Sequence, residues 1–200
     1  NGCEKSTIFK LLERFYECKV GKIEINQVPI NKYSASDLRN NIVYMPKKPF
    51  FLQGTIMDNL KLGQNEISDL EVIEVCKKVG IHSDIQKLEK GYYELIESGG
   101  ENFSSGQKQK LGFVRVLLKK ADIVLLDEVT SDLDGEAERQ ICNQIEEIAK
   151  KAIVLNIAHK PESIRRSKKV FFIQGGKIVA EGTHKALMKN CVDYKKIFAN

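Results

Sequence analysis

A chain of 200 residues is long enough to form one domain with a sizeable buried core, and its composition, 42% hydrophobic and 30% charged, is ordinary for a globular protein. The net charge of +5 is mild, and the lysines are spread along the whole chain, which favours a solvated surface over a stripe that binds nucleic acid. No apolar run approaches the roughly 18 residues needed to span a bilayer. We therefore expect a globular domain without a nucleic-acid partner.

The cysteines favour reduced thiols. There are five of them, an odd number, and no two form a C-x-x-C pair. This pattern argues against a disulfide framework and against a zinc site. The five are Cys3, Cys18, Cys76, Cys142 and Cys191.

The first half of the chain shows both helical and strand periodicity. Apolar residues recur at helical spacing from Ile8 to Phe15, and they alternate with polar ones around Pro29. In chain order, the predicted elements are a helix directly after Lys5, short strands with a turn at 20–30, a strand that stops at Pro46, and a helix at 68–79 capped by Ser68 or Asp69.

The second half alternates strands with helices. The run "ADIVLLDE" at 121–128 is short, nearly all apolar and ends in acids, as in a strand buried on both faces. Two later runs repeat this pattern, and long helical stretches separate the strands, which predicts a mainly parallel α/β sheet. The later strands are predicted at 151–159 and 168–174, the helices at 106–119 and 135–150, and a hairpin turn at 174–179.

The chain opens with "NGCEKST", which partly matches a phosphate-binding loop. Backbone amides at a helix start bind anions, a lysine there reaches the β and γ phosphates, and the next hydroxyl holds Mg²⁺. Lys5 and Ser6 fill these places, but the motif requires glycine where this chain has Glu4. The heptapeptide by itself therefore fits the start of an ordinary helix better than a nucleotide site.

Polar side chains with catalytic chemistry follow the buried strands. Asp127 and Glu128 end one strand, and His159 ends the next. An acid there can hold Mg²⁺, and a second acid beside it can orient or deprotonate an attacking water, although adjacent carboxylates can also simply begin a loop. Because ligands of open α/β sheets bind beyond the carboxyl ends of the strands, we expect these residues to meet, joined by the loop before Lys5.

The run "FSSGQKQKLGFVRVLL" leads a serine and a glycine directly into a helix. Exposed backbone amides and a serine at a helix start form an anion site, but they also form an ordinary helix cap. The run alone favours the cap.

The order of these motifs resembles the nucleotide-binding domain of ATP-binding cassette (ABC) transporters. "GGENFSSGQKQKLGFVRVLLKKADIVLLDEVTSDLD" resembles the family's signature, Walker B and D-loop block, and "IVYMPKKPFFLQGTIMDNL" resembles its Q-loop segment. "IVLNIAHK" resembles the switch-histidine strand, and "GGKIVAEGTHKALM" the hairpin and helix that follow it. "GTIMDNL" and "ESGGENF" look most like exporters. The resemblance covers essentially the whole chain.

The resemblance implies a role for each matching residue. Lys5 and Ser6 would bind the phosphates, and Ser6 and Asp127 would hold Mg²⁺. Glu128 would be the general base or would orient the attacking water, and His159 would contact the γ-phosphate of ATP. The other residues expected to bind ATP are Gly2, Cys3, Glu4, Thr7, Lys47, Ser104, Ser105, Gly106, Gln107 and Asp132.

The resemblance also implies a fold and partners. We expect an α/β P-loop NTPase domain over 1–200, with a mainly parallel sheet, flanking helices and a helical signature subdomain at about 52–120. Family members form head-to-tail dimers around two Mg-ATP, in which Ser104 and Gly106 face the ATP of the other domain and Asp132 bridges the two. The partner would be an identical or different nucleotide-binding domain, and transmembrane domains of an exporter would hold both at the cytoplasmic face of the cell membrane.

Departures from the family pattern bear on activity. Glu4 crowds and repels a triphosphate, which would weaken ATP affinity by about tenfold to a thousandfold. Lys47 replaces a glutamine; a charged lysine accepts no hydrogen bond and ligates no metal, so it would pair with the γ-phosphate, or with Glu4 if the two lie close. Ser105 replaces a glycine of the signature, which is a milder change.

The family's first strands, including one that is central in its sheet, have no counterpart in these residues. We therefore expect the chain to be a piece of a longer polypeptide, marginally stable or prone to aggregate by itself. Two rivals to an ATP-hydrolysing exporter motor remain. One is a degenerate half-site that binds ATP weakly and supports a competent partner. The other is a soluble ABC ATPase that acts on DNA or ribosomes.

Overall fold

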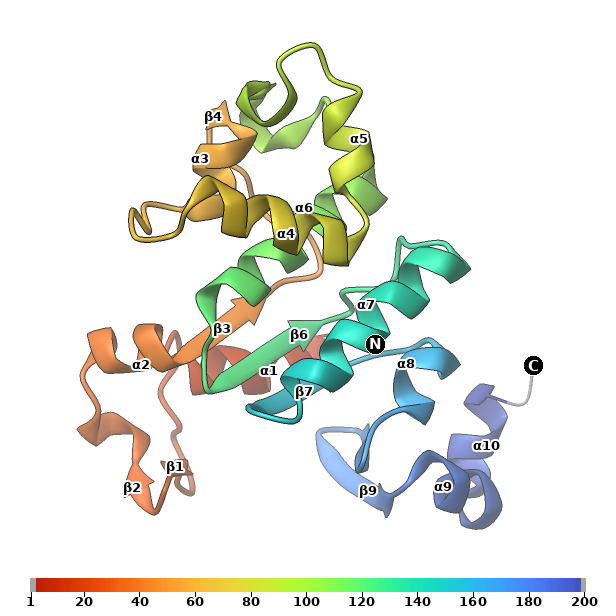
Figure 1. Cartoon of the computed structure of the whole chain (residues 1–200). Helices are drawn as coiled ribbons and strands as arrows, with labels where there is room; N and C mark the ends of the chain where they lie inside the picture. Colours follow the sequence, from red (N-terminus) through yellow and green to blue (C-terminus); the bar gives the residue numbers. More distant parts are fainter. Residues whose placement is uncertain (1–2, 199–200) are drawn as a thin grey trace.

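The computed structural model describes residues 3–198, and three parallel strands form the sheet at its centre. β3 (Ile42–Met45), β6 (Ile123–Asp127) and β7 (Ile153–Ile157) lie side by side in that order (Figure 1). Both connections between neighbouring strands run through helices, which is how parallel strands are joined. The predicted parallel α/β sheet is confirmed.

β6 is buried on both faces, as its apolar sequence predicts. Val124 and Leu126 pack in a large core cluster with α6 (Ser105–Lys119) and α7 (Gly135–Ile148). Leu125, which alternates with them along the strand, packs on the opposite face with Phe9 of α1 (Cys3–Leu12). The molecule therefore has a layer of helices on each face of the sheet.

The remaining elements are short. They are β1 (Glu24–Ile25), β2 (Val28–Pro29), η1 (Ile30–Lys32), α2 (Ala35–Asn41), β4 (Gly54–Thr55), α3 (Ile56–Lys61), α4 (Asp69–Val79), α5 (His82–Gln86), η2 (Gly91–Tyr93), β5 (Leu95–Ile96), η3 (Ser98–Gly100), α8 (Pro161–Arg165), β8 (Val170–Gln174), β9 (Lys177–Gly182), α9 (His184–Asn190) and α10 (Val192–Phe198).

Most predicted elements are present, with adjusted ends. The helix after Lys5 is confirmed, but it ends at Leu12, because Arg14 has a positive φ of 56° and Phe15 is 68% exposed. The cap of α4 is Ser68, whose side chain accepts the backbone N–H of Glu71. The strands at 121–128, 151–159 and 168–174 and the hairpin after them are also confirmed.

Several short helices were not predicted, namely α2, α3, α5, α8 and α10. α2 and α3 have seven and six residues, too short to show a clear helical periodicity. Each begins with a capping box, in which Ser34 or Thr55 exchanges hydrogen bonds with the Asp three residues later. The residues of these capping boxes were the feature of the sequence from which α2 and α3 could have been predicted.

Helices α3 to α5 gather away from the sheet, at the top of Figure 1, and α6 runs from them down to β3. Their apolar residues belong to the same core cluster as those of β6, so the region is packed onto the sheet. Arg115 of α6 strengthens this packing: its Nε donates to the carbonyl oxygen of Asn59 at 2.7 Å, and its guanidinium lies 4.5 Å from the ring centre of Phe51. Whether 52–120 acts as a subdomain stays a prediction.

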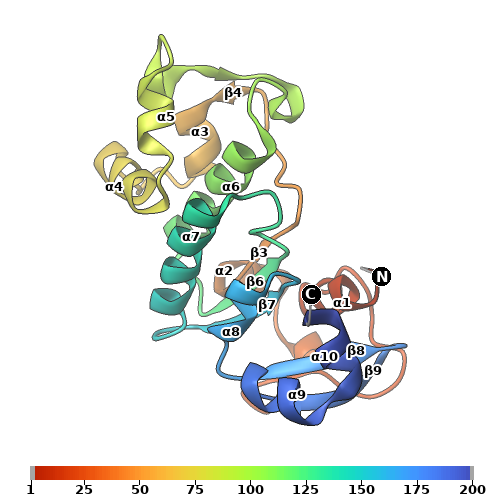
Figure 2. The ribbon, with the colours of Figure 1, turned by 90° about the vertical axis from the view of Figure 1, so that its right-hand side faces the viewer.

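The C-terminal part forms a small cluster of its own. β8 and β9 pair as an antiparallel hairpin, and α9 and α10 lie beside it (Figure 2). Ile164, Leu187 and Tyr194 are buried there, with Val170 and Phe172 packed against them.

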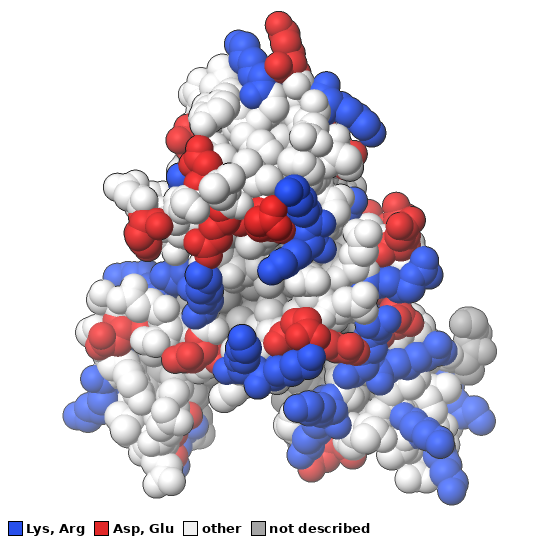
Figure 3. Space-filling view, in the orientation of Figure 1, with Lys and Arg blue, Asp and Glu red and all other residues white. Residues whose placement is uncertain are grey.

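Charges of both signs are interleaved on the surface in Figure 3. On this face, Lys and Arg predominate at the lower right, where Figure 1 shows the C-terminal elements. Within residues 3–198, we find no helix with the length and apolar character of a membrane span. The four cysteines Cys18, Cys76, Cys142 and Cys191 are free thiols.

Candidate functional site

The start of α1 and the end of β6 meet at one edge of the sheet. The hydroxyl of Ser6 donates a hydrogen bond to Oδ2 of Asp127 at 2.6 Å, and the hydroxyl of Tyr44 donates to the same oxygen at 3.3 Å. Burial and the neighbouring Asp127 raise the pKa of Tyr44 to about 12, so it remains a donor. The start of the opening helix and the acid that ends β6 therefore meet, as the position of Asp127 at a strand end predicted.

Glu128 is the centre of a second set of contacts at this edge. Its Oε1 lies 2.9 Å from Nε2 of His159, and its Oε2 lies 2.5 Å from Nζ of Lys47. Glu128 has a positive φ of 51°, and its N–H donates to the carbonyl oxygen of Ile157, which turns the side chain out beyond β6. The structure therefore places Glu128 and His159 together, as the strand ends predicted.

Charge holds Glu128 as a carboxylate. Partial burial by itself would raise the pKa of Glu128, but the hydrogen bond from Lys47 and the charges of His159 and Lys47 outweigh it. The pKa of Glu128 therefore lies below its usual value, and the same contact raises the pKa of Lys47. Lys47 forms its ion pair with Glu128. The sequence also suggested Glu4 as a partner of Lys47, but the side chain of Glu4 lies outside the part of the chain that the structure describes. Gly2 and the side chain of Cys3 lie outside it as well.

The start of α6 is a fully formed helix cap. The side chain of Ser104 accepts the N–H of Gln107 at 3.2 Å, and the side chain of Gln107 accepts the N–H of Ser104 at 3.0 Å. Ser104 and Ser105 are exposed and leave the helix start open to solvent. A Cβ on Gly106 would lie 3.3 Å from the carbonyl oxygen of Asp132, so the start of α6 packs closely on the loop after β6. The cap interpretation is confirmed, while an anion role stays a prediction.

Gln109 joins these segments and was missed from sequence. Its side chain is 1% exposed; Nε2 donates to the hydroxyl of Ser131 at 2.9 Å, and Oε1 accepts the N–H of Asp132 at 3.1 Å. The readable signal was its spacing, because Gln109 continues the helical stripe of the buried residues Phe113 and Val116. A polar residue on an apolar stripe needs a partner.

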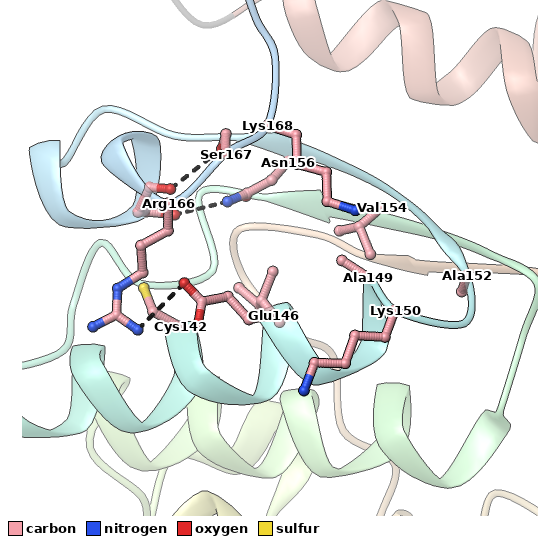
Figure 4. Close-up of a pocket in the computed structure, with 12 residues that line it drawn as sticks. Cys142, Glu146, Ala149, Lys150, Ala152, Val154, Asn156, Arg166, Ser167 and Lys168 are labelled. Atoms are coloured by element: carbon pink, nitrogen blue, oxygen red, sulfur yellow. Dashed lines mark hydrogen bonds and ion pairs between the residues drawn. The ribbon is translucent and has the colours of Figure 1, made fainter. Parts of the chain in front are cut away.

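Two hollows in the structure differ in their position and in the residues that line them. The smaller, about 220 Å³, is lined by Glu128, Thr130, Ser131, Ala158, His159 and Lys160 and so lies at the predicted site. The larger, about 460 Å³, lies between α7, β7 and α8 (Figure 4). None of the predicted site residues lines it, so we assign the site to the smaller hollow.

The residues at this edge fit Mg²⁺ bound together with a nucleotide. Ser6 and Asp127 supply a hydroxyl and a carboxylate 2.6 Å apart, the hard oxygen ligands that Mg²⁺ prefers. Among the described residues, no group of three or more His, Cys, Asp or Glu side chains is placed to hold a metal.

A sequence model of the ABC transporter family matches residues 1–131. The chain belongs to the ABC transporter family. ABC transporter sequences similar to it include multidrug transporter MDR2 of Trichophyton rubrum, 37% identical over 198 residues, and a putative export ATP-binding/permease protein of Rickettsia typhi, 38% identical over 197 residues. Each alignment covers 98% of the chain, but only 14% of the first relative and 34% of the second.

The fold agrees with the family. A bacterial Atm1-family ABC exporter with ATP bound superposes with a TM-score of 0.95 and 30% identity, covering all of this chain and 35% of that one. The chain is thus a nucleotide-binding domain with the P-loop NTPase fold of ABC exporters. It spans about a third or less of the length of these relatives.

Proposed function

We propose that the chain is the motor domain of an ABC exporter, which binds Mg-ATP, hydrolyses it and drives transport. The observation that carries this proposal is the meeting of Ser6 with Asp127, and of Glu128 with His159, at one edge of the sheet. These pairs supply a cation site beside a carboxylate that faces a small hollow.

The chain's residues have complementary tasks in this proposal. Lys5 and the amides at the start of α1 hold the phosphates, and Ser6 and Asp127 hold Mg²⁺, which neutralises phosphate charge when bound. Glu128 orients the attacking water and accepts its proton. His159 holds the Glu128 carboxylate in place from its other side and faces the terminal phosphate.

The relatives support a proposal about the partners of this chain. One similar protein is named an export ATP-binding/permease protein, and the superposed structure is a whole exporter. We infer that a second nucleotide-binding domain faces this one head to tail, with Ser104, Gly106 and Asp132 turned toward the partner's ATP. Transmembrane domains would hold the pair at the cytoplasmic face of a membrane.

The experiment compares native protein with Glu128→Gln in the complete polypeptide that carries this chain. We expect hydrolysis to fall at least about a hundredfold while Mg-ATP affinity is kept, because only the proton acceptor is lost. Glu89→Gln, on an exposed residue far along the chain from the site, is the matched control and should hydrolyse ATP normally. Equal hydrolysis by native and Glu128→Gln protein would refute the assignment.

The second candidate is a degenerate half-site that binds ATP weakly. It is favoured by the ion pair between Lys47 and Oε2 of Glu128, because this oxygen is then not available to a water molecule. Titration of Mg-ATP into native protein and its Glu4→Gly variant separates the two. Similar affinities would support the motor. Binding by the glycine variant alone would indicate a weakened loop that relies on a partner.

A further inference from the structure

Lys47 lies opposite Glu128 because of the register of two neighbouring strands. Met45, at the end of β3, pairs with Leu126 of β6. Lys47 and Glu128 each follow two residues later, so both side chains leave the sheet at the same level. The 2.5 Å contact therefore follows from the sheet itself.

The two partners differ in their freedom to move. The side chain of Glu128 is 13% exposed and is also held by His159, whereas that of Lys47 is 52% exposed and, among the side chains that the structure describes, forms an ion pair with Glu128 alone. Half-exposed ion pairs are weak and exchange readily. Lys47 can therefore leave Glu128 without disturbing the core.

The positively charged ammonium of Lys47 donates hydrogen bonds and accepts none, so a negatively charged acceptor is the partner that it binds most strongly. An arriving terminal phosphate carries more negative charge than one carboxylate. Since His159 and Lys47 touch the two oxygens of the same carboxylate, a phosphate that approaches His159 also comes near Lys47.

We propose that Lys47 helps to distinguish ATP from ADP, by releasing Glu128 and pairing with the terminal phosphate when ATP binds. The inference rests on the proposed nucleotide site. It gives Lys47 two successive partners: Glu128 without nucleotide, and the phosphate that only ATP carries. The exchange frees Oε2 of Glu128 for water at the moment when a reactive phosphate is present.

The test measures affinity for a non-hydrolysable ATP analogue and for ADP, both with Mg²⁺, in the complete polypeptide. Lys47→Met should weaken binding of the analogue about tenfold and that of ADP less than about twofold, since one charge-assisted contact is lost in the first case only. Lys47→Arg keeps the charge and should keep the preference. Lys48→Met, the neighbouring lysine, is the matched control and should bind both like the native protein.

A second measurement tests whether Glu128 and the terminal phosphate are the two successive partners of Lys47. Acylation of Lys47 by an amine-reactive reagent, counted against Lys48 by mass spectrometry, should be slow in the native protein with or without the analogue. In Glu128→Gln it should become several-fold faster without nucleotide and slow again with the analogue. An unchanged preference for the analogue in Lys47→Met, or equal acylation of Lys47 in native and Glu128→Gln protein, would overturn the inference while leaving the motor assignment intact. Failure of the native protein to bind either nucleotide would instead overturn the proposed function, and this inference with it.

Discussion

At the scale of single residues, Glu13 shows how the fold changes a carboxyl group. It directly follows α1, and its Oε2 is buried with no hydrogen-bond partner among the residues that the structure describes. Burial raises the pKa of Glu13 to about 7. Since the folded chain binds this proton more tightly than the unfolded chain does, stability falls as the pH rises from about 4.5 to about 7.

Glu13→Gln should remove the loss of stability that the native protein shows as the pH rises. We expect the variant to be more stable than the native protein by about 1 kcal/mol at pH 8, after allowance for the exposed part of the side chain, and about equal at pH 5. Urea unfolding at the two pH values measures the difference. Glu17→Gln, on an exposed side chain, should show none; a gain for Glu13→Gln that is the same at both pH values would contradict the explanation.

At the scale of elements, α6 connects the parts of the site. Gln109 fastens it to the loop after β6, and Arg115 fastens it to the segment after β3. Gly112 allows the closest approach: a Cβ there would lie 2.6 Å from Cγ of Pro49 and 3.1 Å from Cε of Met45. A helical glycine normally costs stability, so its presence at this contact has a steric reason.

Gly112→Ala should therefore destabilise the domain, although alanine favours helices. We expect a loss of about 1–3 kcal/mol, because the ring of Pro49 cannot turn aside as a flexible side chain would. Thermal unfolding measures it. Gly135→Ala in the first turn of α7, where a Cβ meets only the tip of Arg139 at 3.9 Å, is the matched control and should change stability by less than about 0.5 kcal/mol. A more stable Gly112→Ala protein would show that packing is looser than the structure indicates.

At the scale of the whole molecule, β7 leaves one edge of the sheet open. It pairs with β6 on one side, and no strand within residues 3–198 pairs with its other side. The 460 Å³ hollow beside it is lined in part by the apolar residues Ile145, Ala149 and Val154, of which Figure 4 labels the last two. Open edges beside apolar surface promote association between chains.

These 200 residues, expressed alone, should aggregate on warming. Ile153→Lys places a charge on the 62% exposed first residue of β7 and should lower light scattering several-fold. Val192→Lys alters an equally exposed apolar residue on a helix and should have little effect. A sharp, cooperative melt of the unaltered chain without scattering would contradict this prediction.

Much of this architecture could be predicted from the sequence. The buried strand that ends in Asp127 and Glu128 has an unmistakable apolar run, and parallel strands bring such ends together with His159. Short elements were harder: α2 and α3 depend on capping boxes and tertiary packing rather than on periodicity. The length of the first helix was also overestimated, because apolar spacing continues past the backbone turn at Arg14.

The sequence by itself determined the family, the sheet and the residues that gather at its edge, because motifs and hydrophobic periods are local properties of the chain. Only the tertiary structure decided which side chains of the site contact one another. Lys47 meets Glu128, and Gln109 meets Ser131 and Asp132, across 81 and about 22 residues of chain. Such contacts depend on strand register and helix packing, which no local stretch of sequence encodes.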